Sequence, residues 1–215
     1  MENAENHNVS RSLIKSKKRV AAHGEVFTPS WLVEAMLDLA GDSDRVEARF
    51  LETACGNGNF LICVLQRKLA VVELKSKEFI HGKNYFALVA IMSIYGIELL
   101  EDNIVECRQR MLELFAEYLK IAPSDGFYRA AAYVLSLNIV HGDALKMLTN
   151  SGRPIVFAEW EYLGKQKFQR RDFRFELLTQ ASGNDRKSKV PIKVYSSMTV
   201  DEIVRSGSKI CEVSL

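Results

Sequence analysis

Residues 50–62 constrain the fold of this chain more than any other stretch, with the sequence Phe-Leu-Glu-Thr-Ala-Cys-Gly-Asn-Gly-Asn-Phe-Leu-Ile. They predict a short buried strand, a turn that contains Gly56 and Gly58, and the start of an apolar helix. Glycine accepts a positive φ and lets a ligand approach the backbone, and the free N–H groups at a helix start hold negatively charged groups. The third glycine of the dinucleotide-binding fingerprint would stand at Leu61, so the stretch argues against a nicotinamide or flavin cofactor.

Two segments of the chain resemble motifs of one enzyme family. The run from Glu52 to Phe60 resembles the first motif of S-adenosylmethionine (SAM)-dependent DNA adenine-N6 methyltransferases, which has the form (Asp/Glu)-Pro-Ala-Cys-Gly-x-Gly. The sequence Gly-Glu-Val-Phe-Thr-Pro at residues 24–29 resembles the companion motif that this family places upstream. The resemblance covers roughly residues 20–145, and Thr53 stands where the family usually has proline.

The resemblance implies SAM as the cofactor and a site built at three consecutive strand ends. In the family, the segment that corresponds to Phe27-Thr28-Pro29 closes over the methionine part of SAM. The aspartate that corresponds to Asp143 contacts the exocyclic amine of the cofactor adenine. The expected cofactor-binding residues are Phe27, Thr28, Glu52, Ala54, Cys55, Gly56, Gly58, Phe60, Glu98, Leu99, Asp143 and Ala144.

The residues themselves favour two of these positions. The segment 94–98 predicts a second strand with Glu98 at its end, and an ionised carboxylate can accept hydrogen bonds from both ribose hydroxyls of an adenosine-type cofactor. The interval from Glu52 exceeds the roughly 20 residues of the dinucleotide fingerprint. A helix over the apolar segment 85–93 accounts for the extra length. Asp143 follows a third predicted strand, which gives its glycine-aspartate turn more weight than such turns have alone.

We therefore expect an α/β fold with a doubly wound, mostly parallel sheet, similar to class I SAM methyltransferases. A chain of 215 residues with 47% hydrophobic residues can bury one sizeable core. The expected parts are a basic, partly disordered lead-in at residues 1–20 and a SAM-binding methyltransferase-like domain at 21–160. A basic hairpin with a C-terminal helix and strand is expected at 161–215.

Capping residues indicate where the first long helix begins and ends. Thr28 is expected to cap a helix whose first residue is Pro29. Proline suits the first helical position because an N–H there would have no partner within the helix. Gly41 offers a stop signal for that helix. Further along the chain, residues 124–129 are expected to form a loop.

The C-terminal region has a capping signal of its own. Thr199 and Glu202 predict a capping box at the start of a short helix. Gly207 is expected to stop this helix, and residues 209–215 are expected to form a final strand.

The acceptor motif of adenine-N6 methyltransferases, (Asn/Asp/Ser)-Pro-Pro-(Tyr/Phe), is absent, because the chain has four prolines and no two are adjacent. In that motif a side chain and a backbone carbonyl accept hydrogen bonds from the target amine, while the aromatic ring stacks on the extruded base. Residues 153–162 stand in its place. Glu159 and Trp160 are the candidates for a substitute acceptor and stacking platform. The alternative is that, as adjacent residues of a strand, one faces the core and the other faces solvent.

A hairpin is predicted over residues 153–175, and it carries basic residues interleaved with phenylalanines. Cations for phosphates beside aromatic surface are typical of nucleic-acid binding. The residues expected to contact nucleic acid are Lys165, Lys167, Arg170, Arg171 and Arg174. The alternative is a solvated basic face with the phenylalanines buried behind it. The basic residues in 1–20 have a similar pair of interpretations, a solvated lead-in or an arm on the DNA backbone.

Composition excludes some classes of protein. The net charge of +2 neither requires nor excludes a nucleic-acid partner. The four cysteines include no Cys-x-x-Cys pair, so we expect buried free thiols in a reducing cytosol and no metal site. The longest uncharged run, residues 84–97, is too short to span a bilayer, and the polar N-terminus has no apolar signal core. We predict a cytoplasmic protein without membrane contact.

Three functions remain open at this point. The first is a SAM-dependent DNA adenine-N6 methyltransferase of the restriction–modification or phage type, which would need a substitute acceptor motif or a partner subunit that supplies one. The second is a non-catalytic subunit or degenerate remnant that keeps the fold and binds SAM or DNA. The third is a methyltransferase that acts on RNA or a small molecule. The sequence indicates neither the target nor the oligomeric state.

Overall fold

The computed structural model describes residues 14–41, 45–75, 82–179 and 190–212. A four-stranded sheet in the order β1-β2-β3-β4 lies at its centre. β1 pairs in parallel with β2, β2 pairs in parallel with β3, and β4 runs antiparallel to β3. The strands are β1 (Phe50–Glu52), β2 (Ile94–Glu98), β3 (Ile139–Asp143) and β4 (Leu148–Thr149). The prediction of an α/β fold with a mostly parallel sheet is confirmed.

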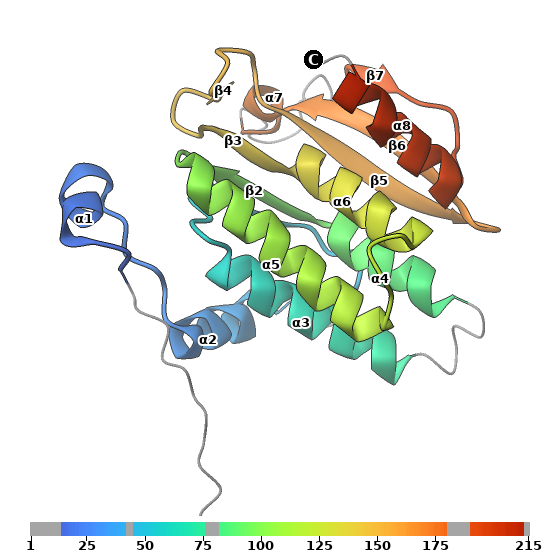
Figure 1. Ribbon diagram of the computed structural model, residues 1–215, viewed down its shortest axis with the longest axis horizontal. Coiled ribbons are helices and arrows are strands. Elements are labelled where there is room, and N and C mark those ends of the chain that lie inside the picture. Colours follow the sequence, from blue (N-terminus) through green and yellow to red (C-terminus); the bar gives the residue numbers. More distant parts are fainter. Residues whose placement is uncertain (1–13, 42–44, 76–81, 180–189, 213–215) are drawn as a thin grey trace, which may run out of the picture.

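Helices pack against one face of this sheet and form the main core. Figure 1 shows α3 and α5 in front of the parallel strands. The apolar stripe of α5, with Ile104, Cys107, Met111 and Phe115, is buried there together with Ile94 of β2. The helices of this layer are α3 (Asn59–Leu74), α4 (Lys83–Met92), α5 (Glu101–Leu119) and α6 (Gly126–Asn138). Each connection between parallel strands therefore contains helices, as a parallel crossover requires.

A second, antiparallel sheet covers the other face. Tyr95 and Ile97 of β2 pack there against Ile155, Phe157 and Phe175 in a separate apolar cluster. The sheet has the order β5-β6-β7, and its long hairpin runs beside α8 in Figure 1. Its strands are β5 (Val156–Gly164), β6 (Lys167–Arg174) and β7 (Lys193–Val194), with helices α7 (Phe175–Thr179) and α8 (Val200–Glu212).

The predicted hairpin is confirmed, and its turn has an identifiable geometry. Lys165 and Gln166 link β5 to β6, and both have a positive φ, 48° and 63°. Two consecutive residues with positive φ match the right-handed twist of the flanking strands, which is why this turn type closes short hairpins.

The start of the chain differs from the prediction in two ways: the cap of the first long helix is one residue later, and a short helix precedes it. The N-terminal helices are α1 (Lys17–His23) and α2 (Ser30–Ala40). Pro29, with φ −67° and ψ 148°, is the capping residue of α2 and no side chain caps it, so the expected cap at Thr28 is wrong. Gly41 ends α2 with φ 72°, as predicted. The expected lead-in falls partly outside the described residues, and its limit at residue 20 lies within α1.

Two expectations in the second half of the chain are wrong. The expected loop at 124–129 instead contains the start of α6, where the side chain of Asp125 accepts a hydrogen bond from the backbone of Phe127. The capping box of α8 forms, but the helix continues through Gly207 to Glu212. It replaces the expected strand over residues 209–212, and residues 213–215 of that strand lie outside the described residues. Glycine at 207 lets α8 pack closely on α6, because a Cβ there would lie 3.0 Å from the ring of Tyr133.

The expected domain limit between residues 160 and 161 falls inside β5. Because β5 contacts both α4 and α6, the hairpin packs on the helical layer along its length. The division of the chain into domains stays a prediction. In the part of the chain that the structure describes, no helix is both long and apolar enough to cross a membrane.

Candidate functional site

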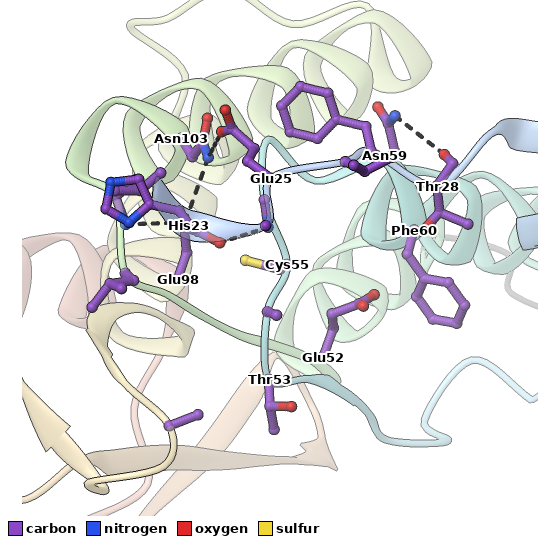
Figure 2. A pocket seen from close by; sticks show the side chains of 18 of the residues that line it. His23, Glu25, Thr28, Glu52, Thr53, Cys55, Asn59, Phe60, Glu98 and Asn103 are labelled. Atoms are coloured by element: carbon purple, nitrogen blue, oxygen red, sulfur yellow. Dashed lines mark hydrogen bonds between the residues drawn. The ribbon is translucent and has the colours of Figure 1, made fainter. Parts of the chain in front are cut away.

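A cavity of about 420 Å³ lies where the parallel strands end. Its walls come from the segment after α1, the turn after β1, the loop after β2 and the turn after β3 (Figure 2). Ligands of α/β sheets bind at the carboxyl ends of the strands. Its lining residues include His23, Gly24, Glu25, Val26, Phe27, Thr28, Glu52, Thr53, Ala54, Cys55, Gly56, Asn59, Phe60, Glu98, Leu99, Leu100, Asn103, Gly142, Asp143, Ala144 and Leu145.

The glycine turn has a backbone shape that other residues adopt at a cost. Gly56 and Gly58 have φ of 53° and 88°, in the left-handed region. A Cβ on Gly58 would lie 2.7 Å from Sγ of Cys107, so the turn sits directly on α5. A Cβ on Gly56 would lie 3.2 Å from the ring of Phe27, which covers the turn from the other side. The upstream segment and the glycine turn therefore form adjacent walls of one cavity.

Glu98 ties the turn after β1 to the loop after β2. Its Oε2 accepts a hydrogen bond from the backbone N–H of Gly56 at 2.9 Å. Its Oε1 accepts from the backbone N–H of Leu100 at 3.0 Å and from Nδ2 of Asn103 at 3.4 Å. The side chain is buried, so these donors replace the water that an ionised carboxylate would otherwise bind. Glu98 thereby fixes the position of both loops at the cavity.

Glu52 ends β1 with a carboxylate that lacks such donors. Its Oε2 is buried, and no group in the described part of the chain forms a hydrogen bond with it. Burial raises the pKa of Glu52 to about 7, because removal from water disfavours the charged form. Because Glu52 is among the residues that line the cavity, a ligand donor that reached this oxygen would be stabilised.

Asp143 closes a turn at the end of β3. Its Oδ1 accepts hydrogen bonds from the backbone N–H groups of Leu145 at 2.9 Å and Lys146 at 3.1 Å. These bonds and the ion pair with the Lys146 ammonium at 3.2 Å lower the pKa of Asp143, so its carboxylate is ionised. A ring nitrogen of His141, Nε2, lies 3.1 Å from the carbonyl oxygen of Leu99 and links β3 to the loop after β2.

The cavity is lined by carboxylates and lacks strong cations. Glu25, Glu52, Glu98 and Asp143 contribute to its wall. None of the described residues that line it is a lysine or an arginine, and His23 is the histidine among them. Just outside the lining, Lys146 pairs with Asp143 and Arg19 pairs with Glu25. Phosphate groups are usually held by arginine or lysine, and the lining itself supplies neither, so it favours a cationic or neutral polar ligand.

The structure brings together all of the predicted cofactor residues except Gly58, which packs beneath the turn on α5. Several lining residues were not predicted. The companion motif already contained Gly24, Glu25 and Val26, whereas nothing in the sequence marked Asn103 or His23. The lining residues absent from the prediction are His23, Gly24, Glu25, Val26, Thr53, Asn59, Leu100, Asn103, Gly142 and Leu145.

Glu159 and Trp160 do not line this cavity. Glu159 forms ion pairs with Arg49 at 2.7 Å and with Arg171 at 2.8 Å, beside a separate apolar cavity of about 160 Å³. Trp160 packs against the main core, and the Arg170 guanidinium lies 5.8 Å from its ring centre. This placement contradicts a role for either residue as acceptor or stacking group at the cavity.

Two of the five basic residues expected to contact nucleic acid are paired with carboxylates of the hairpin itself. Arg170 is buried, donates to both carboxylate oxygens of Asp172 at 2.7 and 2.9 Å, and donates to the hydroxyl of Tyr133 at 2.8 Å. Arg171 pairs with Glu161 at 2.8 Å as well as with Glu159. The expected nucleic-acid contact at Arg170 is corrected, because its guanidinium is enclosed.

The phenylalanines of the hairpin point inward. Phe168, Phe173 and Phe175 are all buried, which agrees with the alternative of a solvated face above buried rings. Lys165, Lys167 and Arg174 remain exposed, and nucleic-acid contact through them stays a prediction. The described cysteines Cys55, Cys63 and Cys107 are free and buried, as predicted.

Among the described residues, no group of three or more histidine, cysteine, aspartate or glutamate side chains is placed to hold a metal ion. Comparisons of the chain with protein-family models, with curated proteins and with solved structures found no significant match.

Proposed function

We propose that the cavity binds SAM and that the protein is a SAM-dependent DNA methyltransferase-like protein, of the adenine-N6 type and with a Rossmann-like fold similar to that of class I SAM methyltransferases. The observation that carries the proposal is the acidic lining around a glycine turn at the ends of parallel strands. SAM carries a sulfonium and an ammonium cation against one carboxylate. A lining of carboxylates without lysine or arginine suits that charge and disfavours nucleotide di- and triphosphates.

The residues at the cavity fit the parts of SAM. Under this proposal Glu98 would accept hydrogen bonds from the ribose hydroxyls, and Asp143 would accept from the amine of adenine. The unsatisfied Oε2 of Glu52 supports a site for a cationic donor. Phe27 and Thr28 supply the wall over the methionine part. When bound, SAM would supply an electrophilic methyl group, and these residues would orient it.

A second function has an observation of its own. The acceptor motif is absent from the sequence, and the residues in its place are engaged in ion pairs and core packing away from the cavity. This favours a SAM-binding subunit that depends on a partner chain for methyl transfer. The cytoplasmic location and the restriction–modification or phage setting belong to the same proposal.

The first test is calorimetric titration with SAM, S-adenosylhomocysteine and ATP. We expect both adenosyl ligands to bind and ATP to fail, because ATP adds phosphates to an acidic cavity. Glu52→Gln should weaken SAM binding by about tenfold or more, since a charged hydrogen bond is worth about 1.5–3 kcal/mol. Glu117→Gln, the same change at an exposed position of α5, is the matched control. Absence of SAM binding, or preferential binding of ATP, would overturn the proposal.

Transfer of labelled methyl groups from SAM to unmethylated DNA separates the two functions. Labelled N6-methyladenine would establish an active enzyme. SAM binding without transfer would establish the dependent subunit, and addition of candidate partner chains would then be the next experiment.

A further inference from the structure

Helix α1 is held in place by charge and not by burial. None of its residues is buried. Just before it, the ammonium of Lys15 lies 3.0 Å from Asp102 and 2.8 Å from Glu106, both on α5, and donates to Oδ1 of Asn103 at 2.7 Å. Figure 1 shows α1 at the edge of the molecule, outside the layers of the other helices.

Arg19, within α1, bridges two carboxylates with one guanidinium. Its Nε and one terminal nitrogen donate to the two oxygens of Glu25 at 2.5 and 2.6 Å. Its terminal nitrogens also donate to Asp102 at 2.9 and 3.1 Å. The rigid fork of arginine suits such bidentate contacts, which a lysine cannot reproduce. The pKa of Asp102 falls to about 2 in this arrangement, mainly through the Arg19 hydrogen bond.

Asn103 connects this cluster to Glu98. Its Nδ2 donates to Oε1 of Glu25 at 2.6 Å and lies 3.4 Å from Oε1 of Glu98 (Figure 2). The Lys15 ammonium on the amide oxygen fixes which way the amide points, because a cation requires the oxygen on its side. A continuous chain of hydrogen bonds therefore runs from Arg19 through Glu25 and Asn103 to Glu98.

The same segment forms part of the cavity wall. Gly24, with φ 64°, ends α1 and turns the chain so that residues 23–28 line the cavity. We name residues 15–25 the N-terminal strap. Its position depends on the ion pairs to α5, and its inner end meets the cavity at Glu25.

We propose that Arg19 and Lys15 are positioning residues of the ligand site, which act by holding the N-terminal strap and, through Glu25 and Asn103, the carboxylate of Glu98. The inference rests on the proposed function, because it names further residues that determine affinity at the same site. Neither residue lines the cavity, so their effect is transmitted through the chain of hydrogen bonds.

The test compares Arg19→Met and Lys15→Met with Lys18→Met, the same change at an exposed position of α1. We expect Arg19→Met and Lys15→Met to weaken SAM binding by about tenfold and Lys18→Met to leave it unchanged. Arg19→Lys should be intermediate, since it keeps the charge without the fork. Titration at about 0.1 M and about 1 M NaCl, over which the Debye length falls from about 10 Å to about 3 Å, should show a smaller salt effect in Arg19→Met than in the unchanged protein.

Hydrogen exchange gives a readout that needs no ligand. The backbone N–H groups of Gly56 and Leu100 are bonded to Glu98, so their exchange should accelerate in Arg19→Met and not in Lys18→Met. Unchanged exchange, or SAM affinity equal to that of the unchanged protein, would overturn the inference. If the unchanged protein fails to bind SAM while exchange responds as expected, the proposed cofactor is wrong and the positioning role of the strap stands.

Discussion

Two charged side chains near the sheet show how differently a charge can be accommodated away from water. Lys68 is fully buried, and its ammonium donates to the backbone carbonyls of Val46 at 2.7 Å and Ala48 at 2.5 Å in the segment before β1. Glu52, at the end of β1, has one oxygen without any such partner in the described part of the chain. The lysine is satisfied by the fold, whereas this oxygen of the glutamate has no donor among the described residues.

The raised pKa of Glu52 predicts a pH dependence of stability. Between about pH 4.5 and about pH 7 the carboxyl ionises in the unfolded chain before it ionises in the folded one. The unfolded state binds fewer protons in this window, so the free energy of unfolding should fall as the pH rises. Urea denaturation at a series of pH values should show this fall in the unchanged protein and a flatter profile in Glu52→Gln. Equal slopes in the two proteins would contradict the assignment.

Lys68→Met should destabilise the protein, because methionine fills the same space and leaves buried carbonyl groups without their donor. The expected loss is about 1–3 kcal/mol in the free energy of unfolding. Lys75→Met at the exposed end of α3 is the control, and it should change stability by less than about 0.5 kcal/mol. Chemical denaturation of the three proteins measures both values.

At the scale of elements, the turn between β1 and α3 decides where the cavity lies. Gly58 caps α3 and rests on Cys107 of α5, so two helices meet at one residue without a side chain. Cys55 hydrogen-bonds through its backbone N–H to Ile97 of β2 at 3.0 Å, which closes the turn over the neighbouring strand. Close approach of these elements therefore requires glycine at the contact.

Comparison of Gly58→Ala with Gly152→Ala separates the cost of the contact with Cys107 from the cost of backbone strain alone. Gly58 has φ 88° and its added Cβ would meet Cys107, whereas Gly152 has φ 75° with nothing within 4 Å of an added Cβ. Gly152→Ala should lose only the left-handed strain, about 1–2 kcal/mol. Gly58→Ala should lose more, and the added change Cys107→Ala should recover part of the excess. Denaturation of the four proteins measures these differences, and equal losses for both glycines would contradict the contact.

At the scale of the whole molecule, a buried arginine joins the second sheet to the helical layer. Arg170 on β6 binds Asp172 on the same strand and Tyr133 on α6, and the hydroxyl of Tyr195 donates to Asp172 at 3.0 Å. A buried charge that loses its partner is strongly destabilising. One of the arginines expected to contact phosphates therefore holds the two layers together.

Asp172→Asn and Arg170→Met should each lower the thermal midpoint of unfolding clearly, because each leaves the other buried group uncompensated. Lys165→Ala combined with Lys167→Ala should leave the midpoint nearly unchanged, since both side chains are exposed at the hairpin turn. Only the lysine pair is expected to reduce nucleic-acid binding and its salt dependence. Thermal denaturation and binding titrations at two salt concentrations distinguish these effects, and a stable Arg170→Met variant would contradict the structural role.

The sequence by itself determined the parallel strands, the glycine turn and the hairpin. All of the cofactor residues predicted from it, except Gly58, line the cavity. The strands and turns follow from local periodicity and turn chemistry. The cavity residues follow mainly from the resemblance to adenine-N6 methyltransferases, and parallel strands bring their carboxyl ends to one edge of a sheet. Only the tertiary structure decided which charges remain free. Arg170 binds Tyr133, which is 37 residues away in the sequence, and Asn103 binds Glu25, which is 78 residues away. Sequence patterns do not identify partners that are so far apart in the chain. Packing also explains why α8 continues past Gly207: the glycine lies against Tyr133, and its missing Cβ leaves room for that ring.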